Sequence, residues 1–150
     1  MARGLYTVHG DAQAVSTAIT ILEVTAPSTA VLEIKRACVE QSSVTTSAQA
    51  RIRLLRKTGT ITGTASPPSA IPIDAAASSG VTIKWIATAE GTDGNVIYEE
   101  NFNILNGWLW VPASAMERII VPPSGLIALK FPAAPTSANW TFGFVWVEIG

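Results

Sequence analysis

Side chains able to perform acid–base, nucleophilic or metal chemistry are few in this sequence and widely spaced. The chain has one histidine, His9, and one cysteine, Cys38. No HExxH, CxxC or comparable metal-ligand spacing surrounds either residue, and no GxSxG elbow supports a Ser-His-Asp triad. Most acidic residues occur singly on expected strand faces: Glu23, Glu33, Glu40, Glu117 and Glu148.

Two short motifs come closest to a catalytic or phosphate-binding arrangement. Glu99 and Glu100 are adjacent, but neighbouring side chains on a strand point to opposite faces and do not form an acid–base pair. The TGTITG stretch at 58–63 has two glycines but lacks the Lys-Ser/Thr of a phosphate-binding loop. We therefore expect no enzymatic activity, no cofactor and no metal.

The composition favours a function in binding over a function in catalysis. The 150 residues fit a single domain, 1–150, of which 48% are hydrophobic and only 14% charged, against about 25% charged in a typical soluble domain. Small polar residues must cover the surface, or a partner must hide it. The net charge of −1 predicts no binding to nucleic acid.

The sequence contains no recognisable targeting or membrane-spanning segment. The start, MARGL, lacks the charged and apolar regions of a signal peptide, and no apolar run approaches the roughly 20 residues that span a bilayer. We expect synthesis in a cytoplasm, no membrane partner, and a buried, unpaired Cys38.

The elements that must position these residues are short β-type runs separated by turn residues. Within 49–57, Ile52 and Leu54 lie opposite Arg51 and Arg53, as alternation on a strand requires. The pattern predicts an all-β fold, a sandwich, jelly roll or barrel of about 8–10 short antiparallel strands. The expected strands cover 5–9, 18–25, 30–40, 49–57, 81–88, 96–104, 108–111, 118–121, 126–131 and 140–149.

Three connections carry specific expectations. The Pro/Ser/Thr-rich stretch 58–80 is either a long crossover over the end of a sandwich or an extended arm lying on a neighbour. The turn residues at 90–95 predict a hairpin between 81–88 and 96–104. Residues 113–118 could form a helical turn with Ser114 as its N-cap.

The tryptophans and the one basic row are the remaining candidates for contact surfaces. Trp85 and Trp146 are expected in the core. Trp108 and Trp110 share one strand face, which could line either the core or a sugar-binding or interface surface. The basic row of Arg51, Arg53 and Arg56, followed by Lys57, is either a solvated face or a contact surface for an acidic partner.

Several stretches resemble the jelly-roll head decoration, or cement, proteins of tailed bacteriophages. They are MARGLYTV, LEIKRACVEQSSVTTSAQARIRLLRKTGTITG, the Pro-rich stretch leading to Pro72-Ile73-Asp74, NGWLWVP and LKFPAAPTSANWTFGFVWVEIG. The resemblance implies a jelly-roll-like β-sandwich without catalytic residues. It implies a virion protein, made in the bacterial host cytoplasm, that binds the outside of an HK97-type head and bridges subunits of the phage major capsid protein. Self-association as a dimer or trimer fits such a role.

On this hypothesis the contact residues come from the N-terminal segment, the basic row, the long loop and the paired tryptophans. They are Arg3, Leu5, Tyr6, Arg51, Arg53, Arg56, Ile61, Pro67, Pro68, Ile71, Trp108 and Trp110. Two alternatives remain open: a carbohydrate-binding or adhesion module using Trp108 and Trp110, and another virion component such as a tail or head fibre part.

Overall fold

Alternating burial along the long strands forms the two faces of a β-sandwich. In the computed structural model, β4 (Gln49–Lys57) buries Ile52 and Leu54 and exposes Arg51, as the sequence pattern predicts. The structure describes residues 2–74 and 76–150, so Met1 of the N-terminal motif and Ala75 of the long loop lie outside the described residues.

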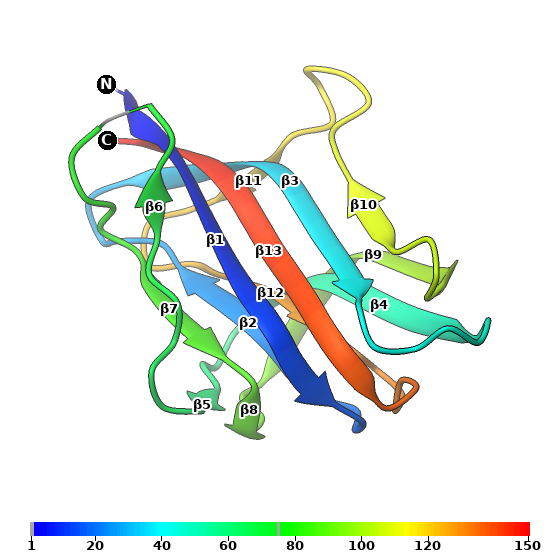
Figure 1. Cartoon of the computed structure of the whole chain (residues 1–150). Coiled ribbons are helices and arrows are strands. Elements are labelled where there is room, and N and C mark those ends of the chain that lie inside the picture. The colour runs from blue at the N-terminus through cyan, green and yellow to red at the C-terminus, as the bar shows by residue number, and fades with distance from the viewer. Residues whose placement is uncertain (1, 75) are drawn as a thin grey trace.

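Two large antiparallel sheets pack face to face, with a small two-stranded sheet beside them (Figure 1). The first sheet has the order β10-β3-β13-β1-β6, and β11 also pairs with β3. The second has the order β7-β2-β12-β4-β9, and β5 pairs with β8. The remaining bounds are β1 (Ala2–Val15), β2 (Thr20–Thr25), β3 (Val31–Gln41), β5 (Thr62–Gly63), β6 (Ile71–Pro72), β7 (Thr82–Trp85), β8 (Ala87–Ala89), β9 (Asp93–Asn103), β10 (Trp108–Trp110), β11 (Ile119–Val121), β12 (Leu126–Lys130) and β13 (Ala138–Ile149).

The strand order confirms the jelly-roll-like sandwich. The first four strands alternate between the sheets, β9 stays beside β4, and the chain then alternates back through β10, β12 and β13. As a result β1 lies beside β13, β2 beside β12, and β4 beside β9. This winding of paired strands across two facing sheets is the jelly-roll arrangement.

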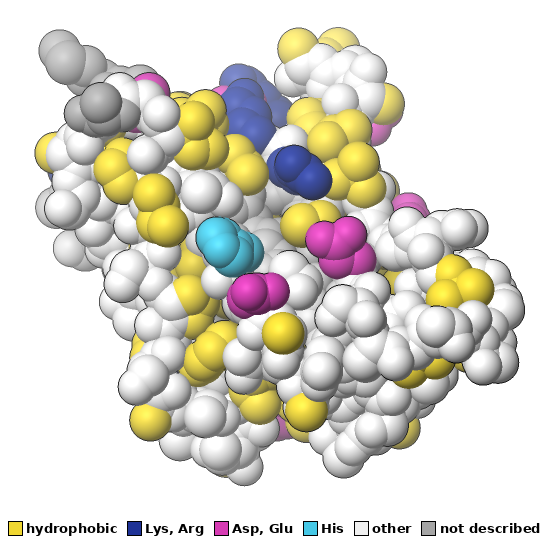
Figure 2. All heavy atoms as spheres, viewed as in Figure 1, with side chains coloured by type: hydrophobic (Ala, Val, Ile, Leu, Met, Phe, Trp, Pro, Cys, Tyr) yellow, Lys and Arg dark blue, Asp and Glu magenta, His cyan; other side chains and the backbone are white. Residues whose placement is uncertain are grey.

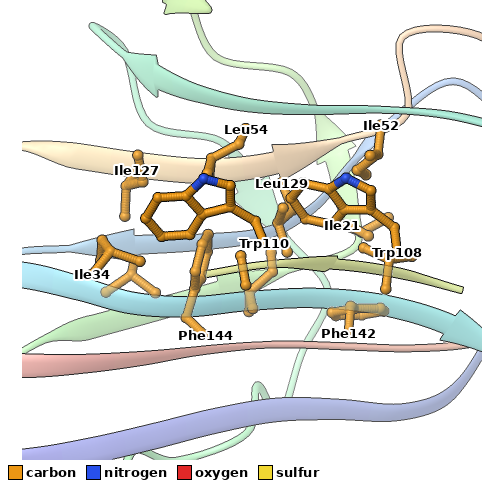
Figure 3. Close-up of a cluster of buried hydrophobic side chains, with 14 of the residues drawn as sticks. Ile21, Ile34, Ile52, Leu54, Trp108, Trp110, Ile127, Leu129, Phe142 and Phe144 are labelled. Atoms are coloured by element: carbon orange, nitrogen blue, oxygen red, sulfur yellow. The ribbon is translucent and has the colours of Figure 1, made fainter. Parts of the chain in front are cut away.

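The core lies between the two sheets and is rich in aromatic side chains. Figure 3 shows Trp108 and Trp110 between Phe142 and Phe144 of one sheet and the aliphatic side chains of the other. Trp146 is fully buried, as expected, and stacks on Tyr6 with ring centroids 6.0 Å apart. Trp85, also expected in the core, is only half-buried and packs at its margin.

A β-bulge corrects the expectation that Cys38 is buried. The register of β3 against β13 shifts between Val145 and Trp146, and the extra residue in β3 reverses its in–out alternation. Before the bulge Leu32 and Ile34 face the core, and after it Ala37 and Val39 do. Cys38 is therefore half-buried on the outer face of the sheet.

The expected hairpin between 81–88 and 96–104 is wrong. β7 pairs with β2, and β9 pairs with β4, at opposite edges of the five-stranded sheet. The turn residues at 90–95 instead connect β8 to β9, and two of them, Glu90 and Asp93, bind lysines of β4 and β12. Residues 113–118 form a turn closed by Glu117 N–H and Ser114 O, 3.1 Å apart, and no helix is present there.

The long loop lies on its own domain, which favours the crossover over the arm. Its first part forms β5 beside β8, and its second part forms β6 on the edge of β1. We call residues 64–80 the strap. The strap passes from the small sheet to the edge of the six-stranded sheet and then returns to β7 (Figure 1).

Candidate interaction surfaces

Buried charged side chains hold the connecting segments onto the sandwich. Glu23 of β2 is fully buried and accepts hydrogen bonds from Thr60 Oγ1 at 2.5 Å and Ile61 N at 3.1 Å. Lys84 Nζ donates to the same threonine hydroxyl and to Ile61 O, both at 2.9 Å. These bonds fix residues 58–63 over β2, since a buried carboxylate is stable only when its lone pairs are satisfied.

Glu148 of β13 anchors the strap in the same way. Its buried carboxylate accepts hydrogen bonds from Ser79 Oγ at 2.7 Å and Gly80 N at 3.2 Å. Arg3 Nη1 lies 3.3 Å from the same carboxylate. Upstream, Asp74 Oδ2 accepts from Leu5 N at 3.0 Å. The strap is therefore tied to the N-terminal strand and to the last strand at once.

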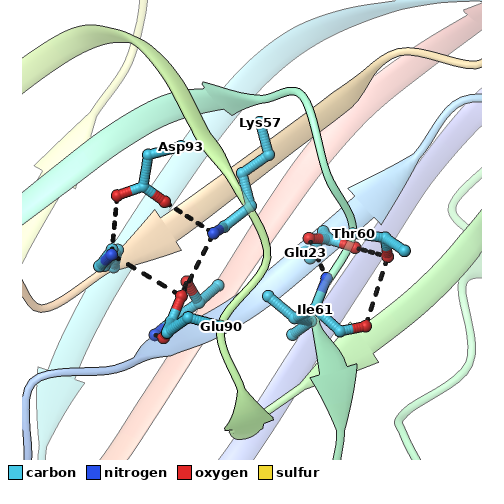
Figure 4. A network of polar contacts seen from close by, with 8 residues as sticks. Glu23, Lys57, Thr60, Ile61, Glu90 and Asp93 are labelled. Carbon is cyan, nitrogen blue, oxygen red and sulfur yellow. Dashed lines mark hydrogen bonds and ion pairs between the residues drawn. The ribbon is translucent and has the colours of Figure 1, made fainter.

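A four-residue ion network fixes the connection between β8 and β9 (Figure 4). The buried Lys57 ammonium lies 2.7 Å from Asp93 and 3.2 Å from Glu90. Lys130 Nζ lies 2.7 Å from the other Asp93 oxygen. Glu90 also accepts hydrogen bonds from Thr20 N at 2.6 Å and Thr20 Oγ1 at 2.7 Å.

Hydrogen bonds affect the pKa values of three charged groups in this network more than burial does. Burial alone lowers the pKa of Lys57, but its hydrogen bonds to Asp93 and Glu90 raise the pKa overall. Burial raises the pKa of Glu90, while hydrogen bonds from Thr20 and Lys57 lower it overall. Burial likewise raises the pKa of Asp93, and bonds from Lys130 and Lys57 lower it overall. These shifts favour the charged forms of Lys57, Glu90 and Asp93.

Trp108 and Trp110 do not form an exposed aromatic surface. Each is 6% exposed, because both point between the sheets and close the gap between β10 and β9. Trp108 Nε1 donates to Glu100 Oε2 at 2.6 Å, and Trp110 packs on Tyr98 with ring centroids 5.7 Å apart. Of the two expectations for these tryptophans, core or contact surface, the structure therefore shows the core.

Tyr6 and Ile61, expected at the surface, are also buried. The Tyr6 ring lies against Trp146, and its hydroxyl donates to Ala77 O of the strap at 2.7 Å. Burial raises the pKa of the Tyr6 phenol, and the nearby Glu148 carboxylate raises it further. Ile61 is 1% exposed, because its backbone is bound to Glu23 and its side chain lies on the sheet. Both residues are therefore part of the protein interior and not of its surface.

Arg51 and Arg53 of the basic row lie on the outer face of the five-stranded sheet, whereas Arg56 lies on the same face of β4 as Ile52 and Leu54 and pairs with Ile127 of β12. Arg51 and Arg53 share one carboxylate, Glu99, at 3.6 Å and 3.2 Å. Glu99 and Glu100 do point to opposite faces of β9, since Glu100 binds Trp108 at the sandwich margin. Arg56 is half-buried and makes no ion pair with another described residue. The structure is compatible with both expectations for this row.

The other predicted contact residues lie on or next to the strap and are at least partly exposed. The Arg3 side chain is 40% exposed, Ile71 is 50% exposed and Pro67 is exposed. Leu5 and Pro68 are half-buried beside them. We call these five residues, together with Ile73, the strap surface. Ile73, 53% exposed, was not predicted, because the strap has no alternating pattern to indicate which side chains face outward.

A shallow hollow lies on the outer face of the six-stranded sheet (Figure 2). Gly143 of β13 pairs with His9 of β1 on one side and with Cys38 of β3 on the other. A shallow space of about 270 Å³ is lined by these three residues, and Arg36 and Glu40 of β3 line it as well. A second hollow of about 240 Å³ continues toward β10 and shares Arg36, Cys38 and Glu40. We call the two together the Gly143 hollow.

Exposed apolar side chains on and after β10 were missed by the sequence analysis. Leu109 is 58% exposed, Val111 51% and Met116 92%. Met116 lies on the loop between β10 and β11, which projects from the edge of the sheet (Figure 1). The only signal in the sequence was an apolar residue within a polar turn, which does not indicate exposure.

Comparisons with protein-family models, with curated proteins and with solved structures find no match to this chain. Within the described ranges, no group of three or more His, Cys, Asp or Glu side chains could hold a metal ion. In the same part of the chain, no helix is long and apolar enough to cross a bilayer.

Proposed function

We propose that this protein is a non-enzymatic capsid decoration protein that binds the outside of a phage head through its strap surface. The observation that carries the proposal is the pair Ile71 and Ile73, each about half exposed on one edge of the sandwich. An exposed apolar patch rimmed by polar residues is typical of a protein–protein contact site. Arg3 and Asp74 supply such a rim.

The attachment of the strap supports this role. Glu148 and the Tyr6 hydroxyl bind strap atoms at 2.7–3.2 Å, and Asp74 of the strap accepts a hydrogen bond from Leu5 N of β1 at 3.0 Å. A surface segment held in one conformation loses little conformational entropy on binding, so more of its contact energy contributes to affinity. A segment with little regular structure is thereby made suitable for docking onto a rigid shell.

Decoration also fits the modest size of this patch. A capsid presents the same site many times, so a contact of moderate affinity can still cover the shell and oppose its disassembly. The proposed partner is the phage major capsid protein, and the proposed location is the virion exterior. The resemblance to cement proteins points to the same partner.

The carbohydrate-binding alternative loses its main support, because its two candidate tryptophans are 6% exposed. A role as a tail or head fibre part remains an alternative that shares the fold and differs in location.

The test is binding to purified phage heads that lack this protein. We expect the wild-type chain to co-sediment with the heads and to raise the temperature at which they release their contents. The Ile71→Asp/Ile73→Asp variant should bind at least about tenfold more weakly, since two charges would be desolvated in the contact. Val96→Asp, at a 43% exposed site on β9, is the matched control and should bind like the wild type.

Two results would contradict the proposal. The first is no binding of the wild-type chain to the heads at micromolar concentration. The second is equal binding by the strap variant and the Val96 control. Co-sedimentation with purified tails and not with heads would favour the tail alternative.

A further inference from the structure

The loop between β10 and β11 presents one apolar side chain followed by two opposite charges. Met116 is 92% exposed, and Glu117 and Arg118 beside it are exposed. Neither charge makes an ion pair with another described residue. The turn is ordered, because Ser114 Oγ accepts from Met116 N at 3.3 Å and Ser114 O accepts from Glu117 N. We call Met116, Glu117 and Arg118 the tip.

The Gly143 hollow offers a space beside two charged side chains, which could receive the tip. Its lining includes two small residues, Gly143 and Cys38, which are neighbours in the register. Arg36 and Glu40 stand exposed at its side, and neither forms an ion pair with a described residue. The hollow thus offers space for an apolar side chain beside one positive and one negative charge.

Tip and hollow are complementary in shape and in charge. Methionine is unbranched and flexible, so it fits irregular shallow spaces well. Glu117 has the charge that suits Arg36, and Arg118 has the charge that suits Glu40. The loop that carries the tip projects from the edge of the sheet (Figure 1).

We propose that the tip of one molecule binds the Gly143 hollow of a second copy of this chain. Met116 enters the space above Gly143, Glu117 faces Arg36 of the second copy, and Arg118 faces its Glu40. Because tip and hollow are different surfaces, copies joined by this contact form a closed ring, an open chain, or a two-fold dimer in which the contact occurs twice. This contact is separate from the strap surface and does not depend on a capsid.

The test measures the mass of the purified full-length chain in solution by light scattering over a range of concentrations. We expect concentration-dependent assembly of the wild type. Glu117→Arg and Arg36→Glu should each raise the dissociation constant at least about tenfold, since each places like charges together. Arg56→Glu, on the other sheet, is the matched control and should assemble like the wild type.

Combining the two charge reversals makes the test specific. A chain with both Glu117→Arg and Arg36→Glu should assemble again, because opposite charges face each other once more. A mixture of the two single variants should also assemble, because in each pairing the tip of one variant and the hollow of the other carry opposite charges. General misfolding of a variant would not give either rescue.

A wild-type chain that stays monomeric at the highest concentration would overturn the proposal, and so would single variants that assemble normally. Failure of rescue in both the double variant and the mixture would also overturn it. Capsid binding by the strap surface is measured separately on the Glu117→Arg variant. A loss of self-association is therefore distinguishable from a loss of capsid binding.

Discussion

Several individual charged residues in this protein hold connecting segments against the sandwich. Glu23 and Glu148 are fully buried, and each accepts hydrogen bonds from a segment with little regular structure. Leaving such donors unsatisfied costs the full desolvation of each group. The acids that stood isolated in the sequence therefore have a structural use that their spacing did not reveal.

Glu148→Ala should lower the free energy of unfolding by about 2–4 kcal/mol, because Ser79 and Gly80 would lose a buried acceptor and Arg3 its counter-charge. Urea denaturation followed by tryptophan fluorescence measures this change. Glu117→Ala, at an exposed position, should change it by less than about 0.5 kcal/mol. Equal effects of the two substitutions would contradict the anchoring role of Glu148.

At the scale of elements, β10 closes the sandwich with two indole rings while its central residue faces solvent. Trp108 and Trp110 are 6% exposed, and Leu109 between them is 58% exposed. The strand has only three residues, so its attachment depends on these side chains and on pairing with β3. Neighbouring positions of one strand should therefore differ strongly in their tolerance of substitution.

Trp110→Ala should reduce the free energy of unfolding by about 3–5 kcal/mol, the usual range for a buried aromatic side chain. Leu109→Ala should reduce it by less than about 0.5 kcal/mol, since an exposed side chain loses little contact. Thermal unfolding monitored by circular dichroism compares the two. A similar loss in both variants would show that Trp110 is not part of the core.

The ion network between β4, β9 and β12 predicts how stability depends on pH. Because folding lowers the pKa values of Glu90 and Asp93, the unfolded chain binds more protons in acid. The network's stabilisation is present above the ordinary carboxyl pKa values of about 4. It is lost as the pH falls through the lower values of the folded state.

We expect the free energy of unfolding to fall between about pH 5 and pH 2. In the Glu90→Gln/Asp93→Asn variant this decrease should be smaller, because two of the titrating groups are gone. Urea titrations at each pH measure it for both proteins. Parallel curves for the wild type and the variant would exclude the network as a source of the acid dependence.

For the whole molecule, one hydrophobic cluster connects both sheets. Tyr6 and Trp146 from one sheet and Leu54 and Leu129 from the other belong to the same buried set. A single shared core leaves neither sheet able to keep its apolar face dry alone. The two layers should therefore unfold together.

Unfolding should be two-state, with one transition in urea. Far-ultraviolet circular dichroism reports the strands, and tryptophan fluorescence reports the core, so the two curves should coincide. Transitions separated by more than the fitting error would show that one sheet unfolds before the other.

Many strand positions in this protein were predictable from local pattern, although β1 extends over 2–15 and the expected strand 81–88 is divided into β7 and β8. β4 has the bounds expected from the sequence, 49–57, because alternation of Ile52 and Leu54 with arginines depends only on neighbouring residues. The absence of helix from the described residues and the sandwich class follow from the same repeated pattern. Arg3 and Ile71, chosen as contact residues from their place near the chain end and in a Pro-rich loop, are exposed, and their part in binding stays a prediction.

The tertiary structure decided which strands pair and which side of each strand is buried. β7 and β9 are neighbours in sequence but lie at opposite edges of one sheet, because strand pairing depends on the winding of the whole chain. A bulge in β3 turned Cys38 outward. The strand face of Trp108 and Trp110 was expected from their spacing, but only the opposing sheet made that face part of the core. Alternation places side chains on one side or the other of a strand, and long-range packing determines which side is buried.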